Sequence, residues 1–192
     1  MIKDFIEKLI HLCLPMLYLL IGVGLPADIC AGTVEEYSVK AALAFNFARF
    51  TDWPPETLVD SPKTLNICIF GDNAVLEAFA DVEGKRVKGR RIVLKRVRSM
   101  RKSVDCELFF VSGSPRELLP KIFAAVEGKP VLTIGEMAGF TEAGGIINLV
   151  KTEKRIRFEV NLKAAQRAGL KISSRILKLA TIVGGSHGEE RK

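Results

Sequence analysis

Two cysteines outside the N-terminal segment are the residues of this chain whose chemistry is easiest to specify. Cys68 lies inside the apolar run Leu65–Phe70, and Cys106 precedes a second apolar run, Glu107–Ser112. Short apolar runs that end at turn residues predict strands buried on both faces, as in the centre of a parallel sheet. If these strands are neighbours, the thiols can meet and form a disulfide in an oxidising compartment. The alternative is two buried free thiols that pack as small apolar side chains.

Histidine is nearly absent from the chain. One of the two, His11, lies in the N-terminal segment, and the other, His187, lies in a polar tail. The folded domain therefore has no imidazole for a Ser-His or Cys-His nucleophile, a metal ligand or a general base. Two cysteines are also too few for a zinc site of cysteine and histidine ligands. Chemistry by carboxylates or lysines stays open, but no acid/base pair is visible in the sequence. We therefore expect no catalytic residues, no metal and no cofactor, and we do not expect an enzyme.

The first 31 residues have the layout of a secretory signal peptide. An apolar stretch of 14 residues, Leu12–Leu25, follows two lysines and precedes the small residues Ala31 and Gly32. This stretch is short for a membrane span, which needs about 20 residues. We expect cleavage near Ala31 or Gly32 and export of the mature domain; the alternative is an uncleaved membrane anchor.

The chain is basic, with a net charge of +7, which becomes +8 when residues 1–31 are removed. Ten of the 18 residues in the range 85–102 are Lys or Arg. Within this basic segment, Gly89–Arg98 alternates enough to predict a strand near a sheet edge, where such charges block edge-to-edge pairing. The alternative is a surface for an anion or a partner. No aromatic residue interrupts the run, so it offers no stacking platform and we expect no nucleic-acid partner.

Strands and helices alternate along most of the chain. This rhythm predicts an α/β fold of three layers, with a mostly parallel sheet flanked by helices in a Rossmann-like arrangement. Thr33 and Glu36 fit a capping box at the start of the first helix. We expect a single domain over residues 32–183 and a disordered tail over 184–192. The expected helices are 34–50, 74–80, 116–126, 162–168 and 173–183, and the expected strands are 65–70, 89–98, 106–112 and 131–134.

The pattern changes after the strand 131–134. A glycine-rich loop, Gly135–Gly145, leaves the C-terminal end of a parallel strand, where open α/β sheets form ligand crevices. Met137 and Phe140 are therefore candidate crevice residues. Two strands then follow, Ile146–Lys151 and Arg155–Asn161, whose spacing predicts an antiparallel C-terminal hairpin with one buried and one polar face.

Three ordered motifs resemble a known family. Lys40–Pro54 is similar to its pattern K-A-A-x-x-x-N-F-x-K/R-F-x-x-W-P, and Arg155–Leu162 (R-I-R-F-E-V-N-L) and Gly169–Ser174 (G-L-K-I-S-S) match its closing motifs. The family is that of the YfiR-like periplasmic regulatory proteins, and the resemblance extends from about Tyr37 to Val183.

The resemblance implies a periplasmic regulator without catalytic activity. Such a regulator binds and represses an inner-membrane sensor protein, here expected to be a diguanylate cyclase of the YfiN type that controls cyclic di-GMP and biofilm formation. An outer-membrane YfiB-like lipoprotein is a second expected partner, and another copy of the chain is a third. The alternative function is a periplasmic small-ligand-binding protein that uses the loop 135–145 as its crevice.

The resemblance also places particular residues. Cys68 and Cys106 fall where the family has one of two disulfides, whereas Thr141 and Asn148 stand where the second would be. Redox control through a second bridge is therefore not expected.

Two hairpin residues are carried over as partner-binding candidates, Ile147 and Glu159. For Ile147 the alternative is an ordinary core position. For Glu159 the alternative is an ion pair with Arg157 or Lys171.

Overall fold

The computed structural model describes residues 28–58, 63–99, 105–113, 116–153 and 155–184. The predicted signal peptide falls almost entirely outside these ranges, and so does the predicted tail after Gly184. The fold discussed below belongs to one compact unit, Val34–Lys192. Among the helices of the described ranges, none combines the length and the apolar content that a membrane crossing requires.

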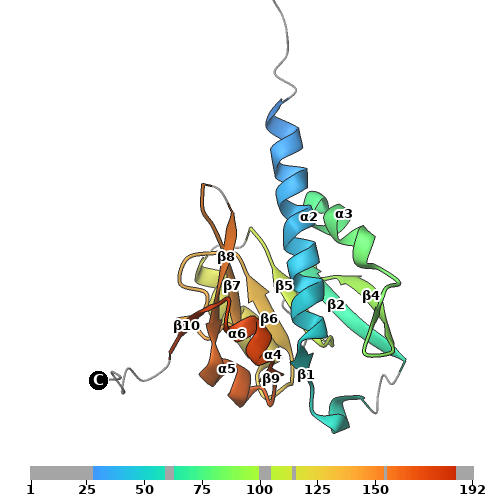
Figure 1. Ribbon diagram of the computed structural model, residues 1–192, viewed down its shortest axis with the longest axis vertical. Helices are drawn as coiled ribbons and strands as arrows, with labels where there is room; N and C mark the ends of the chain where they lie inside the picture. Colours follow the sequence, from blue (N-terminus) through green and yellow to red (C-terminus); the bar gives the residue numbers. More distant parts are fainter. Residues whose placement is uncertain (1–27, 59–62, 100–104, 114–115, 154, 185–192) are drawn as a thin grey trace, which may run out of the picture. The chain divides into compact units, whose positions relative to one another are not determined.

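The first helix, α2, spans Asp28–Arg49 (Figure 1). Small and aromatic side chains at helical spacing give it a buried stripe that includes Ala41, Ala44 and Phe47. The helix ends as predicted before the Trp-Pro-Pro sequence, and the Thr51 hydroxyl donates to the Phe47 carbonyl oxygen at 2.8 Å. The predicted capping box is wrong, because the helix runs without a break through position 33.

The main sheet has eight strands in the order β10-β8-β7-β6-β5-β2-β4-β3. Strands β4, β2, β5, β6 and β7 are mutually parallel, and β7 and β8 form the predicted antiparallel hairpin. Figure 1 shows the hairpin rising at one side of the sheet. The strands are β2 Thr64–Phe70, β3 Arg86–Val87, β4 Arg90–Arg96, β5 Leu108–Val111, β6 Leu132–Gly135, β7 Ile147–Lys151, β8 Ile156–Asn161 and β10 Thr181–Val183.

Helices cover both faces of the sheet and confirm the predicted three layers. On one face α2, α3, α5 and α6 pack on the apolar side chains of β2, β5, β6, β7 and β8. On the other face α4 packs on Phe109, Val111 and both cysteines. The helices are α3 Asn73–Phe79, α4 Leu119–Val126, α5 Leu162–Arg167 and α6 Ser174–Leu177, with 3-10 turns η1 Pro55–Leu58, η2 Ala80–Val82 and η3 Arg116–Leu118.

The C-terminal segment differs from the sequence prediction. The helix expected over Ser173–Val183 stops at Leu177, and Thr181–Val183 forms the edge strand β10, parallel to β8. Three consecutive β-branched residues in this strand favour extended geometry over helix. A second, two-stranded sheet was also missed: β1 (Thr51–Asp52) pairs antiparallel with β9 (Lys171–Ile172).

Candidate functional site

A carboxylate network joins α2 to the C-terminal ends of β5 and β6. Glu136, which directly follows β6, accepts a hydrogen bond from the Lys40 ammonium at 2.5 Å. The Ser112 hydroxyl after β5 also donates to Glu136, and the Tyr37 hydroxyl lies 3.4 Å from the same carboxylate. Three separate segments therefore meet at one side chain, which fixes α2 over the strand ends.

Lys40 is buried between two carboxylates. Its ammonium contacts Glu136 and Glu36, each at 2.5 Å, and its side chain is 7% exposed. Burial alone would lower the pKa of Lys40, but hydrogen bonds to Glu136 and Glu36 outweigh it and raise the pKa. Burial alone would raise the pKa of Glu36, but hydrogen bonds from Lys151 and Lys40 lower it. The network is therefore held charged, and Lys151 extends it to the hairpin.

The glycine-rich loop is closed by Phe140 rather than open as a crevice. Phe140 is 0% exposed, and its ring lies directly against the backbone of two glycines. A Cβ atom at Gly135 would lie 2.4 Å from the ring, and one at Gly145 would lie 2.2 Å from it. These glycines are therefore needed for close packing. Met137 is half-buried against the same cluster. The structure thus places Phe140 in the core and gives it no surface for a ligand.

The outer face of the hairpin holds a second polar cluster, centred on Glu159. The Glu159 carboxylate accepts hydrogen bonds from the Thr141 hydroxyl at 3.2 Å and from the Asn148 amide at 3.1 Å. The amide oxygen of Asn148 in turn accepts the backbone N–H of Met137 at 3.1 Å. Glu159 is half-buried and anchors the loop to the hairpin. It makes these contacts in place of the ion pair with Arg157 or Lys171 that was the alternative.

Ile147, the other partner-binding candidate, is 0% exposed and belongs to the apolar cluster under α2. It pairs with Val160 across the hairpin and with Ile134 of β6. The structure therefore gives it the core position that was its alternative, and a partner could reach it only by displacing this packing.

The two cysteines lie side by side, as the sequence suggested they could. Their strands are neighbours, because β2 pairs with β5, and Cys68 and Cys106 are 2% and 6% exposed. The structure holds them as free thiols, so the disulfide stays a prediction. Burial, and then a hydrogen bond with Cys68, raise the pKa of the Cys106 thiol. Because the thiolate is the reactive form, the folded thiol pair would react slowly.

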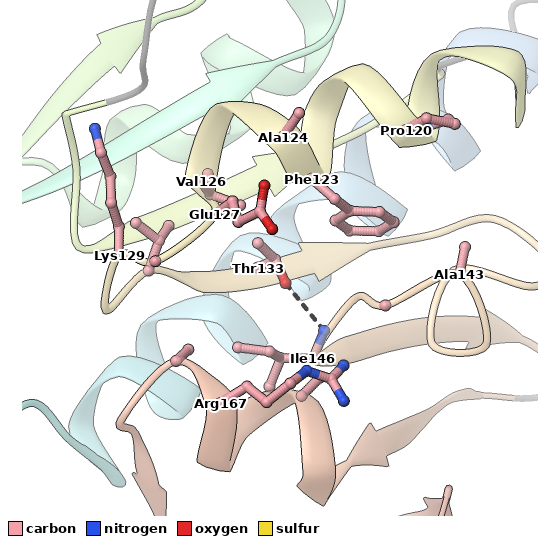
Figure 2. A pocket seen from close by; sticks show the side chains of 15 residues that line it. Pro120, Phe123, Ala124, Val126, Glu127, Lys129, Thr133, Ala143, Ile146 and Arg167 are labelled. Carbon is pink, nitrogen blue, oxygen red and sulfur yellow. Dashed lines mark hydrogen bonds between the residues drawn. The ribbon is translucent and has the colours of Figure 1, made fainter.

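A hollow of about 690 Å³ lies between α4 and α5 (Figure 2). Phe123 and Val126 of α4 form one wall, and Arg167 of α5 reaches along the opposite one. Its floor is held by the hydrogen bond from the Ile146 N–H to the Thr133 hydroxyl, 2.9 Å. The described residues include no group of three or more His, Cys, Asp or Glu side chains that could hold a metal ion.

Sequence reasoning missed a buried ion pair at the opposite, N-terminal ends of the strands. Arg90 begins β4 and contacts Glu107, which precedes β5, at 2.5 Å; both are less than a tenth exposed. The other Glu107 oxygen accepts the Asn66 N–H at 2.7 Å, and the Trp53 indole donates to the Glu107 carbonyl oxygen at 3.2 Å. The basic segment concealed this pair, because strand register rather than sequence spacing brings Arg90 to Glu107.

Comparison with known proteins identifies the family. Residues 37–181 match the model of the YfiR/HmsC-like family, which covers α2 from Tyr37, the complete glycine-rich loop and the hairpin. The chain belongs to the YfiR/HmsC-like family. The match confirms the family expected from the motifs, a family of periplasmic regulators of cyclic di-GMP signalling.

Two solved structures are similar to this YfiR/HmsC-like chain. One is an ABC domain in complex with L-Trp from Streptococcus pneumonia, with 14% identity, a TM-score of 0.43, and coverage of 66% of this chain and 58% of that chain. The other is a conserved domain protein from Vibrio cholerae, with 15% identity, a TM-score of 0.43, and coverage of 68% and 60%. The chain thus spans about three fifths of the length of the solved chains that it matches.

Proposed function

We propose that this protein binds the periplasmic portion of an inner-membrane sensor and represses it, with a diguanylate cyclase of the YfiN type as the target. The family match over residues 37–181 carries this proposal, because it spans the strands from β2 to β8, including the hairpin. A YfiB-like lipoprotein of the outer membrane would relieve repression by competing for the regulator. The output is the level of cyclic di-GMP and, through it, biofilm formation.

The outer face of the hairpin is the contact surface that the geometry favours. Along β8, Phe158 and Val160 enter the core while Arg157 points outward and is exposed. Glu159 on the same face is already bonded to Thr141 and Asn148. Among the described residues, none forms an ion pair with Arg157. An exposed guanidinium on a rigid strand pair fits an acidic partner surface.

Charge reversal of Arg157 tests this surface. Arg157→Glu should reduce recovery of the sensor from solubilised membranes and raise cyclic di-GMP, because like charges then face each other. An exposed substitution rarely changes stability by more than about 0.5 kcal/mol, so the melting temperature should stay near the wild-type value.

Arg91→Glu is the matched control, since Arg91 is an exposed arginine on β4, at the other side of the sheet. Equal recovery of the sensor by the Arg157→Glu variant and the wild type would count against the hairpin face. Failure of the wild type to recover any sensor would count against the proposed function itself.

The rival function, a small-ligand binder with its crevice at Gly135–Gly145, loses its main support from the burial of Phe140. The loop still borders a hollow, through Ala143 and Gly144, on the α4 side. Neither Met137 nor Phe140 lines that hollow, so it is not the crevice that the sequence predicted.

A further inference from the structure

A cleft of about 390 Å³ lies where the order of the strands reverses. From β2 the chain moves to β4 on one side and then returns to β5 on the other. In open α/β sheets, ligands bind outside the carboxyl ends of the strands at such a reversal. The cleft is lined there by residues that follow the three strands, together with Tyr37 of α2; among them are Asp72, Arg96, Arg98 and Ser112.

Four cations of the basic segment are already used by the fold. Arg90 is buried against Glu107, Lys88 pairs with Asp52, and the Arg86 side chain donates to the Gly89 carbonyl oxygen. The Lys95 ammonium donates to the Asp105 carbonyl oxygen at 3.4 Å. These contacts account for the basic residues as structural or edge-protecting groups.

Arg96 and Arg98 are the two cations of this segment that line the cleft. Both are exposed and both line the cleft. Neither forms an ion pair or a side-chain hydrogen bond with any residue in the described ranges. The two guanidinium groups at the cleft are therefore available to a ligand.

The carboxylates nearest the cleft are engaged elsewhere. Asp72 caps α3, with its Oδ1 atom accepting the Val75 N–H at 3.0 Å. Glu136, which bonds to Tyr37 and Ser112 behind the cleft, is neutralised by Lys40. Asp72 and Glu136 thus each have a partner within the fold, whereas Arg96 and Arg98 have none among the described residues.

We propose that this cleft binds a small organic anion that carries a phosphate or a carboxylate group. Arginine presents two parallel N–H donors, which match the oxygens of both groups. The volume lies in the range of small-molecule pockets, about 300–1,000 Å³. The cleft, rather than the loop 135–145, is then the ligand site of the domain. This inference does not rest on the proposed repression, because direct binding tests it.

Calorimetric titration of the purified chain at low salt tests the site, with inorganic phosphate, glycerol 3-phosphate and citrate as probes. The three probes separate free phosphate, an organic phosphate and a carboxylate. Arg96→Ala and Arg98→Ala should each weaken the best probe by about tenfold or more, since a hydrogen bond to a charged group contributes that much. Arg91→Ala, on the same strand but outside the cleft, should stay within about twofold of the wild type.

Conservative variants separate geometry from charge. Arg96→Lys and Arg98→Lys should recover part of the affinity, and melting temperatures equal to that of the wild type would show that all variants are folded. The proposal is overturned if the wild type binds none of the three probes saturably. It is equally overturned if Arg91→Ala weakens binding as much as Arg96→Ala, since binding would then follow net charge alone.

Discussion

Strand β4 carries an arginine at each end, and the two have opposite fates. Arg90, at the N-terminal end, is 6% exposed and contacts Glu107 at 2.5 Å. Arg96, at the C-terminal end, is exposed and has no ion-pair partner among the described residues. The same residue type thus forms a buried ion pair at the N-terminal end of the strand and stays available to a ligand at the C-terminal end. Position along the strand, and not charge density, decides which cation is structural.

The N-terminal ends of the strands are held together because one residue, Glu107, bonds to three segments. Glu107 binds the Arg90 guanidinium, accepts the backbone N–H of Asn66 in β2 and receives the Trp53 indole at its carbonyl oxygen. At the C-terminal ends the strands are followed by glycines, a serine and loop residues, and these residues line a cleft.

The largest expected effect on stability comes from removing the Glu107 carboxylate at the N-terminal ends of the strands. Glu107→Ala removes the carboxylate that contacts the buried Arg90 guanidinium, which should lower the free energy of unfolding by about 3–5 kcal/mol. Urea denaturation measures it. Arg96→Ala, at the other end of the strand, should cost less than about 0.5 kcal/mol. Similar losses of unfolding free energy for both variants would show that the two ends of the strand do not differ in this way.

The second largest effect on stability is expected from the cysteine pair, since Cys106 directly precedes Glu107 in the sequence. A Cys68–Cys106 bridge closes a loop of 38 positions and would stabilise the fold by roughly 4 kcal/mol in the chain-entropy model. Because burial raises the pKa of the Cys106 thiol, the folded reduced chain should oxidise slowly, so the bridge should form before folding is complete.

Thiol titration of the denatured mature protein, prepared without reductant, measures the bridge. We expect no free thiol, and Cys68→Ser should lower stability by the stated amount. Two free thiols per chain would show that the pair stays reduced.

Sequence reasoning succeeded where one strand or helix carried its own signal. The buried runs around Cys68 and Phe109 are strands as predicted, and the structure shows that they are neighbours, which the sequence left open. It failed where the partner lies far along the chain. The pair Arg90–Glu107 and the two-residue strands β1 and β9 depend on register and tertiary contact, to which local periodicity is insensitive. The glycines around Phe140 suggested an open crevice, whereas they allow a ring to pack on the backbone.

On the outer face of the hairpin we expect a smaller difference in stability, between substitutions at Glu159 and at Arg157. Glu159→Lys removes the acceptor of the Thr141 hydroxyl and the Asn148 amide, which should lower stability by about 1–3 kcal/mol. Arg157→Glu, on the same face but exposed, should be close to neutral. Thermal denaturation of both variants checks this. Equal melting temperatures would mean that the Glu159 cluster does not stabilise the loop.

The Lys40 network should give the smallest effect, and one that depends on pH. The pKa of Glu36 is lowered from 4.5, so its contribution is present above pH 4.5 and is lost as the pH falls through its folded value. The pKa of Lys40 is raised from 10.5, so its contribution is present below pH 10.5 and is lost as the pH rises through its folded value. Glu36→Gln should therefore cost up to about 1 kcal/mol at pH 7, and this cost should shrink as the pH falls below 4.5.

Melting curves of the wild type and Glu36→Gln between pH 3 and pH 9 measure this difference. A gap that persists unchanged at pH 3 would show that the carboxylate charge is not its origin.

The short pairing of β1 with β9 bears on the order in which the domain can fold. Thr51 lies opposite Ile172, and the Ser173 N–H donates to the Phe50 carbonyl oxygen at 2.8 Å, so the end of α2 is held by residues about 120 positions later. Chains emerge N-terminus first during synthesis. The central strand β2 can therefore be made early, but α2 gains this clasp only after Ser173 has appeared. A chain that stops short of Lys171 would retain most of its sheet but would lack the pairing of β1 with β9. We expect a protease to cleave such a chain more readily than the complete domain.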